Sequence, residues 1–396
     1  MPPMIRTALV LGLLSAVSPF AIDMYLPAMP AIEAELGAGV SGTQATITAY
    51  FLSFGLAQLI YGPLADRFGR KPPIFAGLGI FLVGTVLCAV APDIRFLIGA
   101  RFLQGLGGAA LMVVPRAIIR DLHTGPEAAK LMAMIMLVIS VSPMLAPLAG
   151  SGVIAIGGWR GVFWVIAAAS LVSLALLAFA QPETLRPENR AAIEPRALRR
   201  NAGILLRDPV FMGLTFVGGL GISSFFVFLT SAPFVYTGTY GLSPTGFSIA
   251  FAMNAIGFFA ASQAAGPLGE RLGMETVVFW ATAGFAAMAS ALVLVVLAGA
   301  GSLPVVVGML FLANAFLGLV IPSTMVMALD PHPEIAGLAS SLGGTLQMVA
   351  GAVAVTLASP FFDGSVLPMV AAIALCGISA FAVALLVDRS GRRQAV

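Results

Sequence analysis

Residues 62–71 read GPLADRFGRK, a short polar stretch between two long apolar runs, 45–61 and 74–91. So brief a charged break between two apolar runs predicts a hairpin that joins two membrane helices. Its two glycines and its proline allow the backbone to turn sharply. Its three cations hold the turn on the cytoplasmic side, because Lys and Arg resist translocation across the bilayer. The stretch therefore predicts topology as well as packing.

Similar stretches return half a chain later. GPLGER at 266–271 repeats the start of the first stretch with an offset of 204 residues, again between two apolar runs. EIAGLAS at 334–340 resembles EAAKLMA at 127–133 with an offset of 207, and Pro322 matches Pro115 with that same offset. Three matches at about half the chain length predict two tandem halves of the same topology.

The composition is that of a membrane protein, with 59% hydrophobic residues, 9% charged residues and a mean hydropathy of +1.03. It excludes a large water-soluble domain. The basic residues behind the net charge of +3 are spread among short loops, so we expect them to set topology and expect no nucleic-acid partner. Cys88 and Cys376 lie inside apolar runs, which indicates small core residues rather than a disulfide or a metal site.

Twelve apolar runs are long enough to span a membrane, since about 30 Å of hydrocarbon requires roughly 20 residues at 1.5 Å each. We expect the first run to be a retained helix rather than a signal peptide, because it is long and lacks a small-residue cleavage pattern. The predicted spans are 7–29, 44–64, 73–91, 95–117, 129–155, 161–180, 210–231, 246–265, 275–298, 303–327, 336–358 and 366–387.

Basic residues are distributed unevenly between the two ends of these spans. With both termini inside, the outer loops hold only Arg95 and Arg160, and this asymmetry predicts cytoplasmic termini. The longest polar segment holds six Arg and falls between the sixth and seventh spans. A linker that also sets topology is a simpler interpretation of it than a binding patch. The predicted domains are thus a bundle at 1–181, a cytoplasmic linker at 182–208 and a second bundle at 209–396.

Twelve spans, two similar halves and GPLADRFGRK after the second span resemble the major facilitator superfamily. RFLQGLGGAALMVVPRAIIRD at 101–121 resembles its fourth-span motif. AIDMYLP at 21–27, SPMLAPLAG at 142–150, GWRGVFW at 158–164 and PETL at 182–185 are similar to the Bcr/CflA group of bacterial drug exporters. The resemblance implies an all-α, multi-pass protein of the bacterial cytoplasmic (inner) membrane, with two pseudo-symmetric six-helix bundles and both termini cytoplasmic.

One stretch departs from the pattern of the superfamily. The fifth-span motif of its antiporters is rich in glycine, whereas Ser142, Ala146 and Ser151 stand here at three of the small positions. Pro147 and Gly150 are kept. Small side chains still allow close helix approach and Pro147 allows a kink, so the antiporter interpretation holds.

Asp23 is the only acidic residue well inside a predicted span. A carboxylate at membrane depth costs about 2.5–3.5 kcal/mol, so it predicts a lined or paired site, and Asp is a usual proton carrier. The alternative is that Asp23 only caps irregular backbone before Pro27 and Pro30. Arg101 lies at about the same depth, roughly 9 Å below the outer surface. Asp23 and Arg101 are the predicted proton-coupling residues, and a purely structural clamp is the alternative.

Polar side chains inside the apolar spans are few. They predict the surface that binds substrate, although contact between helices is the alternative for any lone amide. The 27 Phe and 18 Met provide adaptable apolar surface for varied amphipathic molecules. The predicted substrate-binding residues are Asp23, Tyr25, Tyr50, Arg101, Gln104, Asn254, Asn314 and Gln347.

The resemblance also implies a gate at the GPLADRFGRK loop, locked when the cytoplasmic side is closed. Asp66 and Arg70 are expected to form a charge network with Asp121, at the inner end of the fourth span. A motif that only orients the hairpin is the alternative. Met274 replaces the equivalent of Arg70 in the second copy, so the corresponding lock there, with Glu270 and Asp330, should be weaker. The residues expected to act in gating are Asp66, Arg67, Arg70, Lys71, Asp121 and Pro147.

The sequence lacks the groups that an enzyme or an ATP-driven pump would need. His123 and His332 are the only histidines, both in predicted cytoplasmic loops and without HExxH spacing. No G-x-x-x-x-G-K-[ST] run is present for ATP. We therefore expect secondary transport, with no metal and no cofactor, driven by the proton gradient.

The expected function is efflux of small amphipathic compounds, such as amphenicol- or bicyclomycin-like drugs, in exchange for protons by alternating access. The expected partners are the small-molecule substrate, protons and the lipid bilayer, around a monomer. The alternative function is a facilitator or exporter of a metabolite, a sugar or an amino acid, on the same fold.

Overall fold

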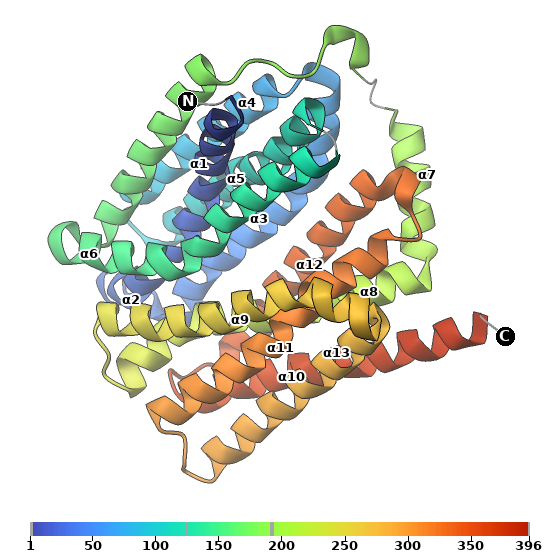
Figure 1. Cartoon of the computed structure of the whole chain (residues 1–396). Coiled ribbons are helices and arrows are strands. Elements are labelled where there is room, and N and C mark those ends of the chain that lie inside the picture. The colour runs from blue at the N-terminus through green and yellow to red at the C-terminus, as the bar shows by residue number, and fades with distance from the viewer. Residues whose placement is uncertain (1–2, 124, 191–193, 395–396) are drawn as a thin grey trace. The chain divides into compact units, whose positions relative to one another are not determined.

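The computed structural model describes residues 3–123, 125–190 and 194–394, and this part of the chain is helical throughout, joined by turns (Figure 1). The chain divides into two compact units, Met1–Glu194 and Pro195–Val396, each described here by itself. In the first unit the helices are α1 (Pro3–Asp23), α2 (Met29–Leu36), α3 (Gly39–Phe68), α4 (Lys71–Ala89), α5 (Ile94–Leu122) and α6 (Gly125–Ala180), with short 3₁₀ turns at Leu26–Ala28 and Pro187–Asn189.

The second unit begins with a short helix and continues with six long ones (Figure 1). Its α-helices are α7 (Pro195–Arg207), α8 (Pro209–Phe234), α9 (Pro244–Leu272), α10 (Met274–Leu297), α11 (Leu303–Leu329), α12 (Ala336–Ala358) and α13 (Val366–Gln394). A π-helical turn, Val235–Thr239, follows α8, and 3₁₀ turns lie at Pro333–Ile335 and Ser359–Phe361. Helix α7 lies within the segment that was predicted as a linker.

Eleven helical runs in the described part of the chain are long and apolar enough to cross a membrane. One of them, Lys130–Ala180, has 51 residues, or about 76 Å of helix, against about 30 Å of hydrocarbon. Gly158 breaks this run with φ 64°, a left-handed conformation that glycine adopts without strain, and α6 turns back there (Figure 1). The run therefore accounts for both the fifth and the sixth predicted spans.

The same pairs of spans pack together in both units. The second and fourth spans pack as α3 on α5 and as α9 on α11, and the third and fourth as α4 on α5 and as α10 on α11. Gly62 lies six residues before the end of α3 at Phe68, and Gly266 lies six residues before the end of α9 at Leu272. The internal repeat therefore corresponds to a repeated helix arrangement.

The first span differs from the prediction of a continuous helix over 7–29. Helix α1 ends at Asp23, a 3₁₀ turn covers Leu26–Ala28, and α2 starts at Met29. Pro27 and Pro30 explain the break, because each proline lacks the N–H that would continue a helical hydrogen-bond ladder. The break places Asp23 at the last position of α1, deep in the unit and only 6% exposed.

Candidate functional site

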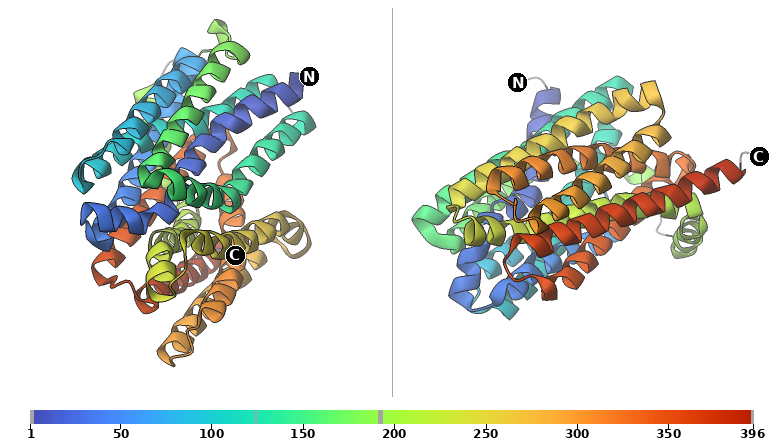
Figure 2. Two further views of the ribbon diagram at one scale, coloured as in Figure 1. Left: turned by 90° about the vertical axis from the view of Figure 1, so that its left-hand side faces the viewer. Right: turned by 90° about the horizontal axis from the view of Figure 1, so that it is seen from below.

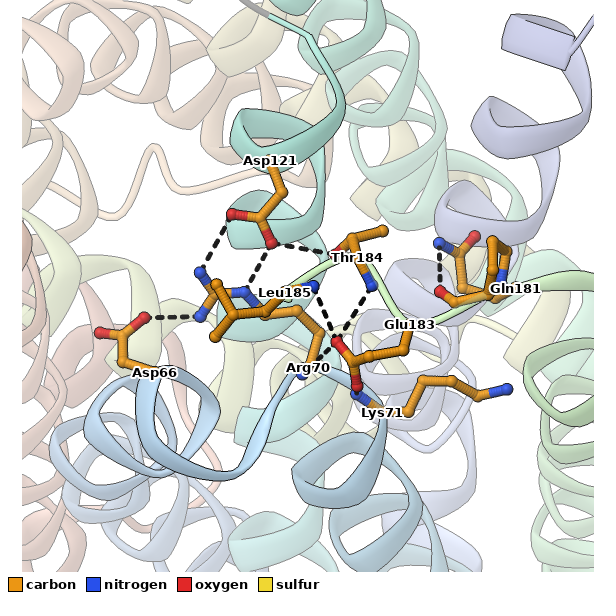
Figure 3. A network of polar contacts seen from close by, with 9 residues as sticks. Asp66, Arg70, Lys71, Asp121, Gln181, Glu183, Thr184 and Leu185 are labelled. Carbon is orange, nitrogen blue, oxygen red and sulfur yellow. Dashed lines mark hydrogen bonds and ion pairs between the residues drawn. The ribbon is translucent and has the colours of Figure 1, made fainter. Parts of the chain in front are cut away.

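The GPLADRFGRK hairpin holds a network of ion pairs (Figure 3). Gly69 has φ 97°, which ends α3 and lets α4 begin two residues later. The Arg70 guanidinium donates from Nη1 to Asp66 Oδ1 at 2.5 Å, from Nε to Asp121 Oδ2 at 2.7 Å and from Nη2 to Asp121 Oδ1 at 3.1 Å. Its two-point contact with Asp121 is the bidentate geometry that favours Arg over Lys. The structure thus brings together three of the residues expected to act in gating.

Glu183, which follows α6 near the C-terminal end of the unit's sequence, completes this network (Figure 3). Its carboxylate accepts from the backbone N–H of Arg70 at 2.8 Å and of Lys71 at 3.0 Å, the unpaired donors at the start of α4. The N–H groups of Thr184 and Leu185 also donate to it, both at 3.0 Å. Burial alone would raise the pKa of Glu183, but these four N–H donors hold its pKa below its ordinary value.

Thr184 joins the same segment to the ion pairs, because its Oγ1 donates to Asp121 Oδ2 at 2.9 Å. Burial would lower the pKa of Arg70, yet its bonds to Asp121 and Asp66 raise it above the ordinary value. Sequence reasoning identified PETL only as a family motif and missed the contacts of Glu183 and Thr184. No local signal could have found them, since Glu183 and Arg70 lie 113 residues apart.

Three other residues expected to act in gating lie outside the ion pairs. The Arg67 guanidinium lies over the ring of Phe68 at 5.2 Å. Lys71 joins through its backbone, while its Nζ donates to the carbonyl of Ala178 at 3.4 Å. Pro147 lies inside α6 where the backbone keeps helical dihedral angles, and the break of α6 is at Gly158 instead.

Arg101, on α5, is held between two tyrosine rings inside the first unit. Its guanidinium carbon lies 4.6 Å from the ring centroids of both Tyr25 and Tyr50. Its Nη1 donates to Gln104 Oε1 at 2.6 Å and to the carbonyl of Ala21 at 3.3 Å. Arg101 has no exposed surface, and its Nε and Nη2 are buried without a hydrogen-bond acceptor among the described residues. The cluster therefore holds a cation whose donors are only partly used.

Asp23 and Arg101, the predicted proton-coupling residues, do not pair with each other in the described part of the chain. None of the ion pairs among the described residues joins them. Instead Ser142 Oγ, on α6, donates to Asp23 Oδ2 at 2.9 Å. Similar depth along two helices does not determine which way a side chain points around its helix. Sequence reasoning treated Ser142 only as a small residue.

A close approach of two helices positions this contact. The Cα of Gly150 on α6 lies against the backbone of Met24, where any side chain would overlap it. The small residue thus allows α6 to reach the end of α1 and brings Ser142 to Asp23. The requirement for small residues in the fifth span is therefore met at Gly150.

Hydroxyl groups fix the orientation of the other polar residues in this cluster. Tyr50 and Ser18 share a hydrogen bond of 2.7 Å, and so do Tyr25 and Thr46. Gln104 Nε2 donates to Thr85 Oγ1 at 2.8 Å. Four of the predicted substrate-binding residues, Tyr25, Tyr50, Arg101 and Gln104, therefore form one buried cluster, with Asp23 nearby on the α1 backbone that Arg101 contacts.

The predicted substrate-binding residues of the second unit are uncharged, and only two of them meet. Asn314 Nδ2 on α11 donates to Asn254 Oδ1 on α9 at 3.3 Å, and Asn254 Nδ2 donates to the carbonyl of Ala250 at 3.0 Å. Gln347, on α12, lies apart from this pair, against Gly218 of α8. The Asn pair is also the usual arrangement of a polar contact between membrane helices.

The second copy of the hairpin forms no ion pairs like those of the first with any residue that the structure describes. Met274 packs over Gly269, and neither Glu270 nor Asp330 takes part in any ion pair found in the described ranges. Instead His332 Nε2 and Asp208 Oδ2 lie 2.7 Å apart, joining the loop after α11 to the start of α8.

Asp208 also caps α8 by accepting from the N–H groups of Val210 and Phe211. Burial would raise the pKa of Asp208, but His332 and these donors hold its pKa below the ordinary value. The second unit therefore has a polar contact of its own at a different pair of elements. No group of three or more His, Cys, Asp or Glu among the described residues could hold a metal.

A further cluster lies in the first unit around GWRG (158–161), at the helix ends opposite the GPLADRFGRK hairpin. Glu35 of α2 accepts from Trp159 Nε1 at 2.7 Å and pairs with Arg160. Arg160 Nη2 donates to the carbonyl of Ala91 at 3.0 Å, and its guanidinium lies 4.1 Å from the Trp159 ring centroid. This cluster joins α2, the end of α4 and the bend of α6.

Residues 11–355 match the family model described as Major Facilitator Superfamily. The uncharacterized MFS-type transporter YdgK of Bacillus subtilis is 33% identical over 87% of this chain and 86% of its own length. A bicyclomycin resistance protein homolog of Haemophilus influenzae is 31% identical over 93% of this chain and 92% of its own. A chloramphenicol resistance protein of Pseudomonas aeruginosa is 31% identical over 69% of this chain and 64% of its own.

Solved transporter structures share the fold. A D-xylose-proton symporter superposes with a TM-score of 0.75 at 16% identity, covering 97% of this chain and 96% of its own. At that identity the likeness concerns the arrangement of helices alone.

Proposed function

The chain belongs to the Major Facilitator Superfamily, and we propose on that premise that it exports small amphipathic drugs from the bacterial cytoplasm in exchange for protons. It is a membrane transporter rather than an enzyme. Relatives named for resistance to bicyclomycin and to chloramphenicol support drugs of such chemistry as substrates. The proton exchange is supported by the buried polar cluster of the first unit.

The observation that carries this proposal is the incomplete hydrogen bonding of Arg101. Its Nε and Nη2 are buried without acceptors from the part of the chain that the structure describes, although a guanidinium is a donor at all of its N–H groups. An unpaired buried donor on a charged group is costly, so a bound molecule that supplies an oxygen acceptor stabilises the site. Amphenicol- and bicyclomycin-like compounds have such carbonyl and hydroxyl oxygens. Tyr25 and Tyr50 provide aromatic surface for their apolar parts.

The proton and the substrate compete for the carboxylate of Asp23. As a carboxylate it accepts hydrogen bonds, as it does from Ser142, and it can accept one from a substrate hydroxyl. A proton taken up from the outside removes this charged acceptor and weakens substrate binding. Release of that proton to the inside restores it. The proton and the drug therefore occupy the site in turn, which is the requirement for antiport.

The hairpin network acts as the gate in this proposal. Arg70, Asp66 and Asp121 hold α3, α4 and α5 together at one end of the first unit. A network of this kind belongs to one conformation of a transporter, so breaking it shifts the balance between conformations.

Asp23→Asn tests the coupling. We expect the variant to lose uphill, proton-driven export while it retains part of its substrate binding, because Asn keeps the volume and hydrogen bonding but cannot titrate. The measurement is substrate-induced proton release from proteoliposomes that contain purified wild type or variant, with a bicyclomycin- or chloramphenicol-type drug. Glu188→Gln, an exposed carboxylate outside the cluster, is the matched control.

Export and binding are compared at equal protein content. Drug binding without proton release in the variant supports the proposal. A proton signal in Asp23→Asn as large as in wild type would contradict the assignment of coupling to Asp23. If Asp23→Asn loses both binding and folding, Asp23→Glu, which keeps the carboxylate, is tested instead. The proposal then requires Asp23→Glu to recover export.

A further inference from the structure

Helix α7 has a basic face that the transport proposal does not use. Its sequence, PRALRRNAGILLR over Pro195–Arg207, contains four Arg and no acidic residue. At about 100° per residue, Arg196, Arg200 and Arg207 fall within an arc of about 40°, and Arg199 lies beside them. The four cations therefore form one stripe along the helix.

The other side of α7 attaches the helix to its own unit. Leu205, roughly opposite the stripe, is fully buried, and α7 packs against α8 and α12. Ile204 and Leu206 lie on either side of the stripe, and each is 48% exposed. A cationic stripe bordered by exposed apolar side chains is the pattern of a helix that lies in a membrane interface.

The stripe has no counter-charge within the described part of the chain. All four Arg side chains are exposed, and none takes part in an ion pair there. The acidic residue that follows, Asp208, is already occupied by His332 and by the N–H groups that it caps. Four like charges on one face repel each other, so the face fits an anionic partner from outside the chain.

The position of α7 identifies the membrane as the source of that partner. Only Asp208 separates Arg207 from Pro209, where membrane span α8 begins, and one residue extends the chain by at most about 3.6 Å. Figure 2 shows α7 beside, rather than among, the long helices of its unit. The basic stripe therefore lies at the level of lipid headgroups.

We propose that α7 is a binding surface for anionic phospholipids of the leaflet next to it. The lipid phosphates accept bidentate hydrogen bonds from the guanidinium groups, while Ile204 and Leu206 contact the upper acyl chains. Juxtamembrane clusters of four or more Arg or Lys are of the size that recognises anionic lipid. The surface belongs to the second unit alone and is independent of the transported substrate.

The test uses the purified full-length protein in detergent, titrated with short-chain phosphatidylglycerol or phosphatidylcholine and followed by native mass spectrometry. We expect phosphatidylglycerol to bind at least tenfold more tightly than phosphatidylcholine. Removing three charges with Arg196→Gln, Arg199→Gln and Arg200→Gln should abolish most of this preference, because each cation contributes about fivefold. Gln keeps a high helix propensity, so α7 should remain folded. The control removes three exposed cations elsewhere, with Arg120→Gln, Arg186→Gln and Arg271→Gln.

A second variant separates lipid from free phosphate. Ile204→Ser with Leu206→Ser should weaken phosphatidylglycerol binding and leave competition by inorganic phosphate unchanged. An equal loss of preference in the control would overturn the assignment to α7. Competition by millimolar phosphate as strong as that by lipid would overturn the lipid assignment, and so would capture of an acidic peptide in preference to phosphatidylglycerol.

Discussion

The two hairpins GPLADRFGRK and GPLGERLGME turn at corresponding glycines and differ in chemistry. Gly69 and Gly273 both adopt positive φ, 97° and 84°, directly after the helix that each hairpin ends. Arg70 is held between two carboxylates in the first hairpin, whereas Met274 packs over Gly269 in the second. The turn therefore needs the glycine and does not need the ion pairs. The ion pairs of the first hairpin are therefore not needed for the turn and can serve function.

The polar groups inside the spans differ between the units in the same way. The first unit buries two ionisable residues that do not pair, Asp23 and Arg101, while the second buries the hydrogen-bonded amides of Asn254 and Asn314. Burial of ionisable groups in a membrane is far more costly than burial of amides, and helix packing alone does not require it. The repeat thus preserves the helix arrangement and leaves the ionisable groups to one unit.

Arg70→Met makes the first hairpin like the second and should have the largest effect. It leaves Asp121, 16% exposed at its side chain, with Thr184 as its remaining side-chain donor. A hydrogen bond to a charged group contributes about 1.5–3 kcal/mol, so we expect export to slow at least tenfold. Drug export and membrane abundance are measured together. Export within twofold of wild type at equal abundance would mean that the motif only orients the hairpin.

Glu183→Gln should have a smaller effect on export, a slowing of about threefold, because the amide keeps one acceptor for the N–H donors of α4. The second hairpin differs at this point, because its acidic residue at the start of the helix, Glu275, belongs to the first turn of α10 itself. Glu188→Gln, also in the segment after α6, is the matched control.

The same variant makes a prediction about pH. Because the pKa of Glu183 lies below its ordinary value of 4.5, its contribution to stability is present above pH 4.5 and is lost as pH falls through the lowered pKa. The difference in Tm between wild type and Glu183→Gln should therefore shrink below pH 4.5. A difference that stays constant from pH 7 to pH 3.5 would contradict the assigned charge.

Met274→Arg, the reverse exchange, should have the smallest effect. The carboxylates expected at the second lock, Glu270 and Asp330, are exposed, whereas the side chain of Asp121 is largely buried, so an ion pair of the new cation with them contributes little and export should stay within about twofold, ~0.4 kcal/mol. The double variant Arg70→Met with Met274→Arg should be as slow as Arg70→Met alone. Recovery of export in the double variant would show that the two hairpins are interchangeable.

The sequence alone determined the number and order of the spans, the two hairpins and the likeness of the two halves. These features depend on hydropathy along the chain and on glycine and proline at particular positions, which act within a few residues. The same local signals contained the break after Asp23, since Pro27 and Pro30 mark it, although a continuous first helix was predicted.

Only the tertiary structure decided the partners of the ionisable residues. Asp23 contacts Ser142 rather than Arg101, Glu183 reaches the start of α4, and Asp208 meets His332. Depth in the membrane follows from position along a helix, but a contact also depends on the rotation of each helix and on how closely two helices approach. Those are decided by packing at residues such as Gly150, which lies close to Ser142 in the sequence but more than a hundred positions from Asp23.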